Sequence, residues 1–379
     1  MKVFLLLASI AFAASSSSGA EPVTASSSWN FAVSGDSRNC GDVVMPSIAA
    51  SVRQNSAAFY WHLGDLRWIS NFDDDMAGAA ALANRPLDIL SYHRAAWPAF
   101  IRNQIAPFAP TPFILSIGNH ETVAPKTRQD FLIQFADWID QPRLQQQRLL
   151  DDPEDHQLHA YFHWYDRGID FISLDNATPE MFDNAEILWL EKIFARDSAD
   201  TSVRAIVLGM HASLPHSLAC DHSMNDTAQG TASGTRVYKD LLRFRDTNHQ
   251  QVYVLASHSH FVMSDIFDTP YWRANGGVLP GWIVGTAGAL RYPLPATATQ
   301  SPYARTGVYG YLLGTVNPPG SAETITFAFQ EVQRKDVGAD VVTRYGAETV
   351  TQCFENNIER SAAKIVTCAE VEPCEESNP

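Results

Sequence analysis

The sequence predicts an α/β fold, and two recurring patterns indicate it. Short apolar or β-branched runs recur six times, each ending in a polar residue, and segments with helical spacing lie between them. The clearest helical segment is 185–197, where Ile187, Leu190 and Phe194 recur at intervals of three and four residues. Strands that alternate with helices imply a layered domain with mainly parallel or mixed sheets.

The expected strands fall into two groups. The six runs of the first group are 29–36, 57–65, 112–121, 168–176, 204–211 and 251–260. A second helical segment, 85–104, is interrupted by Pro98. From about Trp282 the pattern changes to three β-rich runs separated by Gly and Pro, and we expect these to form a second sheet packed on the first.

The N-terminal residues have the layout of a cleaved secretory signal. Residues 1–20 contain Lys2, then an apolar stretch of about ten residues, then small residues. This stretch is too short to span a bilayer, and no later stretch is long and apolar enough to do so. We therefore expect a secreted or periplasmic protein with a main domain over 28–335 and an acidic, cysteine-bearing extension over 336–379.

The net charge restricts the partners. The formal charge is −15 over 379 residues, which argues against nonspecific binding to nucleic acid or anionic lipid. We expect a small-molecule substrate. If that substrate is phosphorylated, an acidic protein needs a local positive centre to bind it.

Cysteines indicate disulfide bonding. The five are Cys40, Cys220, Cys353, Cys368 and Cys374. In an oxidising compartment some should pair, and the three near the C-terminus favour a bridge from Cys353 to Cys368 or Cys374. An odd count leaves at least one thiol free or paired between chains. The absence of a C-x-x-C motif argues against a cysteine zinc site.

Polar residues close the predicted strands. They are Asp36, Asp65, Asn119, His120, His211, His258 and His260. If the strands share one sheet, their carboxyl ends meet and these side chains converge. Taken singly, each has an ordinary explanation, since a Gly-Asp after a strand is usually a turn and loop histidines are common. Together, in this order, they indicate one site built from oxygen and imidazole donors.

The order of these motifs resembles the calcineurin-like metallophosphoesterases. The matching stretches are "GDSR", "GDLRW", "GNHE", "GMH" and "SHSH", and the resemblance covers about residues 30–330. It implies a two-sheet mixed β-sandwich flanked by helices in four layers. It also implies hydrolysis of phosphate mono- or diesters by a metal-bound hydroxide.

The resemblance assigns a ligand set for two divalent or trivalent ions, which could be Mn, Zn or Fe. The six ligands would be Asp36, Asp65, Asn119, His211, His258 and His260. Asp65 would bridge the ions, the first ion would also take Asp36 and His260, and the second would take the remaining three. Because only two of these ligands are anionic, the site would be positively charged. His120 would assist the departing oxygen, and Glu121 would either orient His120 or begin a helix.

Arg38 departs from the family pattern. The family has histidine at this position, or glycine in the purple acid phosphatases, and a guanidinium cannot ligate a metal. Three roles remain open: a clamp on the substrate phosphate, a salt bridge to Asp36 or Asp42, or a sign that the first metal is weakened or absent. Cys40 is considered as a thiolate ligand, although a disulfide or a buried thiol is the more usual state. Trp68 stands where the purple acid phosphatases carry tyrosine, which argues against an iron-tyrosinate centre.

Other polar segments receive simpler expectations. The long segment 212–235 after His211 should border the substrate pocket, with His216 and His222 either near the leaving group or solvated. The acidic run 73–75 is interpreted as a solvated helix start. His62 is interpreted as a core histidine.

The main functional hypothesis is an exported, metal-dependent phosphoesterase. The alternative is a noncatalytic binding or surface protein on the same fold with an incomplete metal site, for which Arg38 is the chief support. The number of bound metal ions separates the two.

Overall fold

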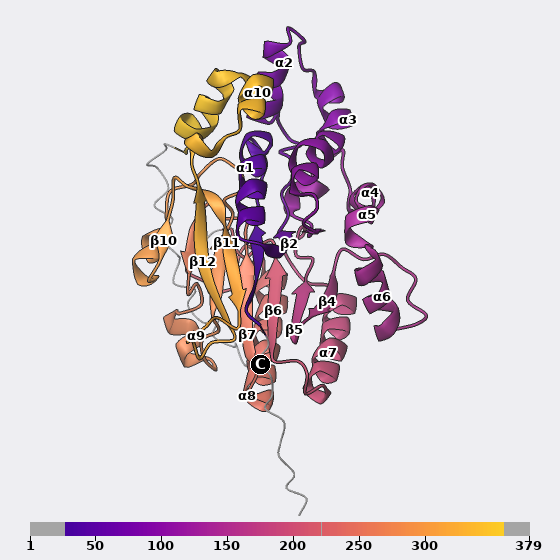
Figure 1. Ribbon diagram of the computed structural model, residues 1–379. Helices are drawn as coiled ribbons and strands as arrows, with labels where there is room; N and C mark the ends of the chain where they lie inside the picture. The colour runs from indigo at the N-terminus through magenta and orange to yellow at the C-terminus, as the bar shows by residue number, and fades with distance from the viewer. Residues whose placement is uncertain (1–26, 221, 360–379) are drawn as a thin grey trace, which may run out of the picture.

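Two mixed β-sheets form the centre of the protein, as a computed structural model that describes residues 27–220 and 222–359 shows (Figure 1). The smaller sheet has the order β12 (Ile325–Val332), β11 (Tyr309–Val316), β1 (Trp29–Ser34), β2 (Ala57–His62) and β3 (Phe113–Leu115). The larger has the order β10 (Ala304–Arg305), β8 (Val262–Ser264), β9 (Gly281–Val284), β7 (Gln251–Ala256), β6 (Ala205–Met210), β5 (Ile169–Ser173) and β4 (Phe162–Asp166). The predicted two-sheet α/β architecture is confirmed.

The allocation of strands to sheets differs from the prediction. β1, β2 and β3 run parallel to one another, and β1 pairs with β11, which pairs with β12. β5, β6 and β7 form the parallel part of the other sheet together with β9. The condition that the six runs share one sheet is therefore not met, and the expectation that the last three runs form a second sheet is wrong, because β9 belongs to the larger sheet and β11 and β12 to the smaller one. A hydrophobic pattern shows which segments become strands, but it does not show which strands become neighbours.

Aromatic rings fill the space between the sheets. Phe31 and Phe59 from the smaller sheet meet Phe171 from the larger one at ring-centre distances of 5.0 and 5.1 Å, both edge to face. Trp61 meets Trp164 in the same way at 5.1 Å. All five residues are buried, so this layer combines burial of apolar surface with favourable ring geometry.

Helices cover the outer faces of the sheets. They are α1 (Gly41–Gln54), α2 (Asp74–Leu82), α3 (Ile89–Phe100), α4 (Arg128–Gln134), α5 (Ala136–Ile139), α6 (Pro142–Asp151), α7 (Asn184–Ala199), α8 (Ala228–Asn248), α9 (Pro270–Ala274) and α10 (Ala339–Thr351). The helix predicted over 185–197 is α7, and Asp183 caps its N-terminus by accepting a hydrogen bond from the Glu186 backbone N–H. The interrupted segment 85–104 is α3, which contains Pro98 and continues into a short π-helical stretch over 101–105.

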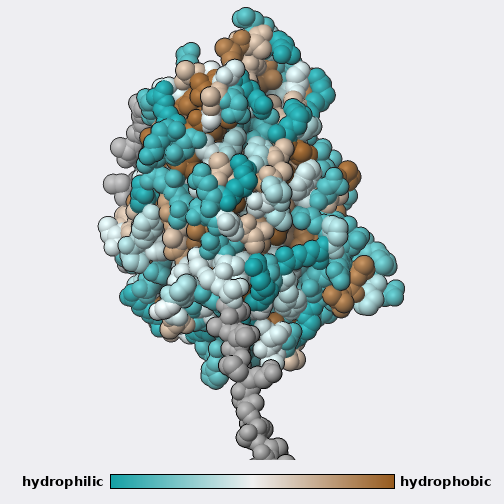
Figure 2. Space-filling view, in the orientation of Figure 1, coloured by the Kyte–Doolittle hydropathy of each residue, from teal (hydrophilic) through white to brown (hydrophobic). Residues whose placement is uncertain are grey.

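The C-terminal part of the described chain packs against the N-terminal helices. α10 lies beside α2 and contacts α1 (Figure 1), and it buries Val341, Tyr345 and Val350. On the face shown in Figure 2 hydrophobic residues are scattered among hydrophilic ones, with some near α2 and α10 at the top. Residues 28–335 and 336–379 remain a predicted division.

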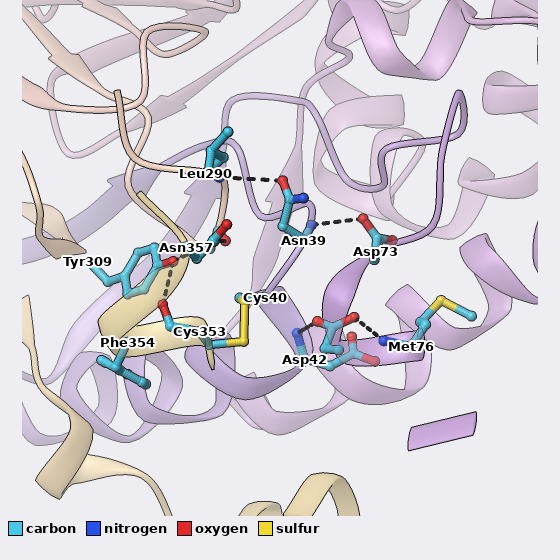
Figure 3. The surroundings of a disulfide bond; sticks show 12 residues. Asn39, Cys40, Asp42, Asp73, Met76, Leu290, Tyr309, Cys353, Phe354 and Asn357 are labelled. Carbon is cyan, nitrogen blue, oxygen red and sulfur yellow. Dashed lines mark hydrogen bonds between the residues drawn. A yellow bond between two sulfur atoms is a disulfide. The ribbon is translucent and has the colours of Figure 1, made fainter. Parts of the chain in front are cut away.

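A disulfide ties this C-terminal part to the start of α1. Cys40 bonds Cys353 across 313 residues of sequence (Figure 3). The predicted bridge from Cys353 to Cys368 or Cys374 is wrong, because Cys353 is already paired. Those two partners and the predicted signal at 1–20 lie outside the described residues. Within the described ranges, no helix is both long and apolar enough to cross a membrane.

Replacing both half-cystines, as Cys40→Ala and Cys353→Ala together, should lower the free energy of unfolding by about 4 kcal/mol, because a long loop is no longer closed in the unfolded chain. Urea denaturation of the double variant measures this. Glu348→Ala, an exposed change on α10, is the control and should alter the free energy by less than about 0.5 kcal/mol. A loss below about 1 kcal/mol in the double variant would contradict a structural role for the bond.

A buried histidine joins β4 to β5 and α6. His163 Nδ1 lies 2.8 Å from Asp170 Oδ1, and Nε2 lies 2.6 Å from Asp151 Oδ2. Burial opposes the charged ring, but Asp170 and Asp151 raise the pKa of His163 to about 9. The folded protein therefore holds an imidazolium between two carboxylates.

Stability should fall as pH rises from about 6.5 to about 9. Because the folded pKa of His163 exceeds its ordinary value of about 6.5, its contribution is complete below pH 6.5 and is lost as pH rises through 9. Wild type should lose on the order of 3 kcal/mol more than His163→Gln across this window in denaturation measured at several pH values. Burial also raises the pKa of Asp197, to about 8, which acts in the same direction, so the difference between the two proteins is the informative quantity. Parallel profiles would refute the assignment.

Candidate metal centre

The predicted site residues come from the carboxyl ends of strands in both sheets. Asp36 follows β1, Asp65 follows β2, Asn119 and His120 lie in the short helix η3 (Asn119–Thr122) after β3, His211 follows β6, and His258 and His260 follow β7. The structure brings all of them together with Arg38, because the parallel parts of the two sheets end at the same side of the molecule. The roles given to them remain predictions.

Four donors form the centre of this cluster. Asp36, Asp65, His211 and His258 each offer one ligand atom, and these atoms all lie within 4.8 Å of one another. All four residues are buried. Asn119 adjoins the group, since its Oδ1 lies 2.9 Å from His211 Nε2.

The backbone that carries the carboxylates is constrained. Asp36, Asp65 and His258 have φ values of 60°, 61° and 63°, in the left-handed region that side chains rarely adopt. The turn at Gly64 and Asp65 packs closely against the turn at Gly118 and Asn119. A Cβ atom added at Gly118 would lie only 2.4 Å from the Asp65 backbone nitrogen, so this position requires glycine. Such strain of about 1–2 kcal/mol per residue is typical of functional sites.

The ring of His211 directs Nε2 at two oxygen atoms of the cluster. Its Nδ1 lies 2.9 Å from the carbonyl oxygen of Leu63, which can only accept, so Nδ1 carries a hydrogen. Nε2 then faces Asn119 Oδ1 at 2.9 Å and Asp65 Oδ1 at 3.3 Å. These three atoms are of the nitrogen and oxygen types that bind a metal ion.

Further buried atoms of the cluster lack hydrogen-bond partners. Within the described part of the chain these include Asp36 Oδ1, Asp65 Oδ2 and His258 Nδ1. An unsatisfied buried polar atom costs about 1–3 kcal/mol, and more when it is charged. The set of carboxylate, imidazole and amide donors therefore fits a metal ion that accepts nitrogen and oxygen ligands.

The ionisation states are those of metal ligands. Burial opposes the charge on Asp65, but the imidazoles of His211 and His120 and the guanidinium of Arg38 hold the pKa of this carboxyl well below its usual range. Burial lowers the pKa of His258 far below its usual value, and burial with the nearby Arg38 lowers the pKa of His260 to about 4. Ionised carboxylates and neutral imidazoles are the forms that bind metal.

Arg38 lies inside the cluster. Its Nη2 lies 3.1 Å from His260 Nε2 and 3.3 Å from Tyr292 Oη, and its Nε lies 3.5 Å from Asp65 Oδ2. The alternative of a salt bridge to Asp42 is wrong, because Arg67 pairs with Asp42 at 2.5 Å. The ion pair of Arg38 is with Asp65.

The acidic run after "GDLRW" is buried, not solvated, at two of its three positions. Asp73 and Asp75 each lie 3.3 Å from Arg67 Nη1 and have no exposed surface. Their carboxylates also accept hydrogen bonds from the backbone N–H groups of Asn39 and Asp42, both at 2.7 Å (Figure 3 shows the first). This corrects the interpretation of a solvated helix start. The carboxylates stabilise the loop that carries Arg38.

Glu121 organises the backbone around Asp65. Its carboxylate accepts from the N–H groups of Gly118 and Asp65 at 2.8 Å and from that of Leu66 at 2.9 Å. Glu121 thus lies in the first turn of η3, which agrees with the alternative that it starts a helix. It also holds the loop after β2, through the backbone of Asp65 and Leu66. His120 is oriented by another group, since its Nδ1 lies 2.6 Å from the carbonyl oxygen of Trp68.

The sequence motifs missed two residues that line the centre. The ring of Tyr292 stacks on His260 at 4.0 Å, and Glu180 Oε1 lies 3.3 Å from His258 Nε2. Both lie in loops that carry no motif, so only the folded chain places them here.

The segment after His211 is shorter as a loop than predicted. It ends at Thr227, whose side chain caps α8, so residues 228–235 are helical. Within the loop, the ring of His222 lies 4.9 Å from that of His258, as expected for a segment beside the pocket. His216 stacks on Tyr271 at 3.5 Å instead. His62 bonds Ser37 Oγ at 3.0 Å in the core, as predicted.

Comparisons with known proteins give similar folds. No family model matches the chain, and no curated protein matches it. Among solved structures, PhoD is similar with 13% identity, a TM-score of 0.48 and coverage of 81% of this chain and 72% of its own. A dimetal phosphatase from Danio rerio gives 11%, 0.48, 80% and 96%. GAP50, the anchor in the inner membrane complex of Plasmodium, gives 12%, 0.45, 80% and 84%.

Glu121→Gln should destabilise the protein by about 2 kcal/mol, because an amide N–H₂ would face backbone N–H groups that now donate to a carboxylate. The free energy of unfolding from urea denaturation tests this. Glu348→Gln, at an exposed position, provides the matched control and should change little. Equal stability of the two variants would show that Glu121 does not hold the loop.

Proposed function

We propose that this protein is a metal-dependent phosphoesterase that hydrolyses phosphate mono- or diesters. The observation that carries the proposal is the buried cluster of Asp36, Asp65, His211 and His258, which offers one ligand atom per residue within 4.8 Å of one another. Asp36, Asp65 and His258 also each have a buried side-chain atom without a hydrogen-bond partner. Such a set favours a cation. Arg38 and His120 beside it supply groups that suit a phosphate ester.

The positive charge needed for an anionic substrate is local. The chain carries a formal charge of −15, so long-range attraction does not favour a phosphate ester. A bound metal ion supplies a Lewis acid that polarises a phosphoryl oxygen and lowers the pKa of water. Arg38 adds the fixed positive charge of its guanidinium beside the donor group.

His120 is the proposed acid for the departing oxygen. Its Nδ1–H is fixed on the carbonyl oxygen of Trp68, so Nε2, 3.8 Å from Asp65 Oδ2, is the atom that turns to the site. Burial lowers the pKa of His120, so the ring is neutral in the free protein. Approach of a phosphate anion favours its protonated form, which can then donate a proton to the leaving group.

The proposed location is outside the cell or in the periplasm. The disulfide between Cys40 and Cys353 supports an oxidising compartment. The substrate class, a small-molecule phosphate ester, is part of the same proposal. The noncatalytic alternative is not favoured, because the four-donor group is complete without the position that Arg38 occupies.

His211→Ala and Asp65→Asn should each lose bound metal and at least about 100-fold in hydrolysis, because each removes a donor from the centre of the group. Metal content by mass spectrometry, and turnover of an aryl phosphate and a bis-aryl phosphate, are measured on the same samples. His156→Ala, an exposed loop histidine, is the matched control and should behave as wild type. Turnover within ten-fold of wild type in His211→Ala would contradict the proposal.

A further inference from the structure

We propose that the guanidinium of Arg38 takes the place of the first metal ion, so that the centre holds a single ion at the donor group of Asp36, Asp65, His211 and His258. This inference rests on the proposed function and deepens it by setting the number of ions. The evidence is where Arg38 lies and which ligand atoms it uses.

The ligand atom of His260 is already engaged. His260 Nδ1 lies 2.6 Å from the carbonyl oxygen of Leu290, so Nδ1 carries the hydrogen and Nε2 carries the lone pair. That lone pair lies 3.1 Å from Arg38 Nη2, which can only donate. His260, which the family resemblance assigns to the first ion, therefore uses this nitrogen to accept a hydrogen bond from the guanidinium.

The two oxygens of Asp65 face different groups. Oδ1 lies 3.3 Å from His211 Nε2 and accepts from the His120 backbone N–H at 2.9 Å. Oδ2 lies 3.5 Å from Arg38 Nε. The carboxylate that would bridge two ions thus has one edge on the four-donor group and the other on a guanidinium.

Arg38 is held in this position. The residue is 7% exposed, and its Nη2 also donates to Tyr292 Oη at 3.3 Å. Directly after it in the chain, the Asn39 backbone bonds Asp73, and Cys40 forms the disulfide with Cys353 (Figure 3). A second cation would therefore have to displace a guanidinium whose backbone is fixed on its C-terminal side.

The four-donor group agrees with one ion. It includes both carboxylate residues together with His211 and His258, but not His260, the residue bonded to Arg38. With one dication and one guanidinium against two carboxylates, the net charge of the site is about +1, compared with about +2 for two dications. Binding of a phosphate ester still has a positive centre, and the guanidinium supplies one of its three positive charges.

The test counts manganese ions. Protein freed of metal and reconstituted with Mn²⁺ is examined by native mass spectrometry and by electron paramagnetic resonance, neither of which depends on activity. Wild type should bind about one Mn²⁺ per chain with the signal of an isolated ion. Arg38→His, which restores the imidazole of the family pattern, should bind about two with the signal of an exchange-coupled pair. Arg38→Ala, which removes the guanidinium without adding a ligand, should also accept a second ion, about ten-fold more weakly than the histidine variant.

Controls separate this inference from the proposed function. His260→Ala should leave the wild-type count at one, and added to Arg38→His it should return the count from two to one. Two coupled ions in wild type would overturn the inference and leave the phosphoesterase proposal standing, whereas none would overturn both. A count that stays at one in both Arg38→His and Arg38→Ala would show that the guanidinium is not what excludes the first metal ion.

Discussion

The structure depends on the burial of several electron-pair donors that have no adequate partner among themselves. Asp36, Asp65, His258 and His260 are buried together, and burial lowers the pKa of both imidazoles, which opposes a proton on either ring. Isolated buried charge of this kind is too costly to persist unless cations compensate it. The guanidinium of Arg38 compensates one side of Asp65, and a metal ion is the natural compensation for the other.

The rest of the fold holds these donors in place. Glu121 binds the backbone of the Gly118 and Asp65 turns. The buried ion pair of Arg67 with Asp73 holds the carboxylate that accepts from the Asn39 backbone N–H. The Cys40–Cys353 disulfide then ties the same loop to the C-terminal end of the described chain. These contacts surround the loops that carry the donors and stabilise their left-handed backbone geometry.

Sequence reasoning found the donors because each ends a strand, and the carboxyl ends of strands are where such folds place ligands. It could not find the sheet partners, because β1 pairs with β11 across nearly the whole chain and no local pattern records that pairing. The Cys40–Cys353 pair and the contact of Tyr292 with His260 are equally non-local. The burial of Asp73 and Asp75 is not evident from the sequence, because their partner Arg67 is itself buried and arginine usually lies at the surface.

Anomalous diffraction at the manganese edge, from crystals of the reconstituted protein, tests the central claim most directly. The account predicts a strong peak about 2.0–2.3 Å from the carboxylate oxygen of Asp65 and the imidazole nitrogens of His211 and His258. An ordered site in which those side chains are well defined but no peak lies between them would contradict it.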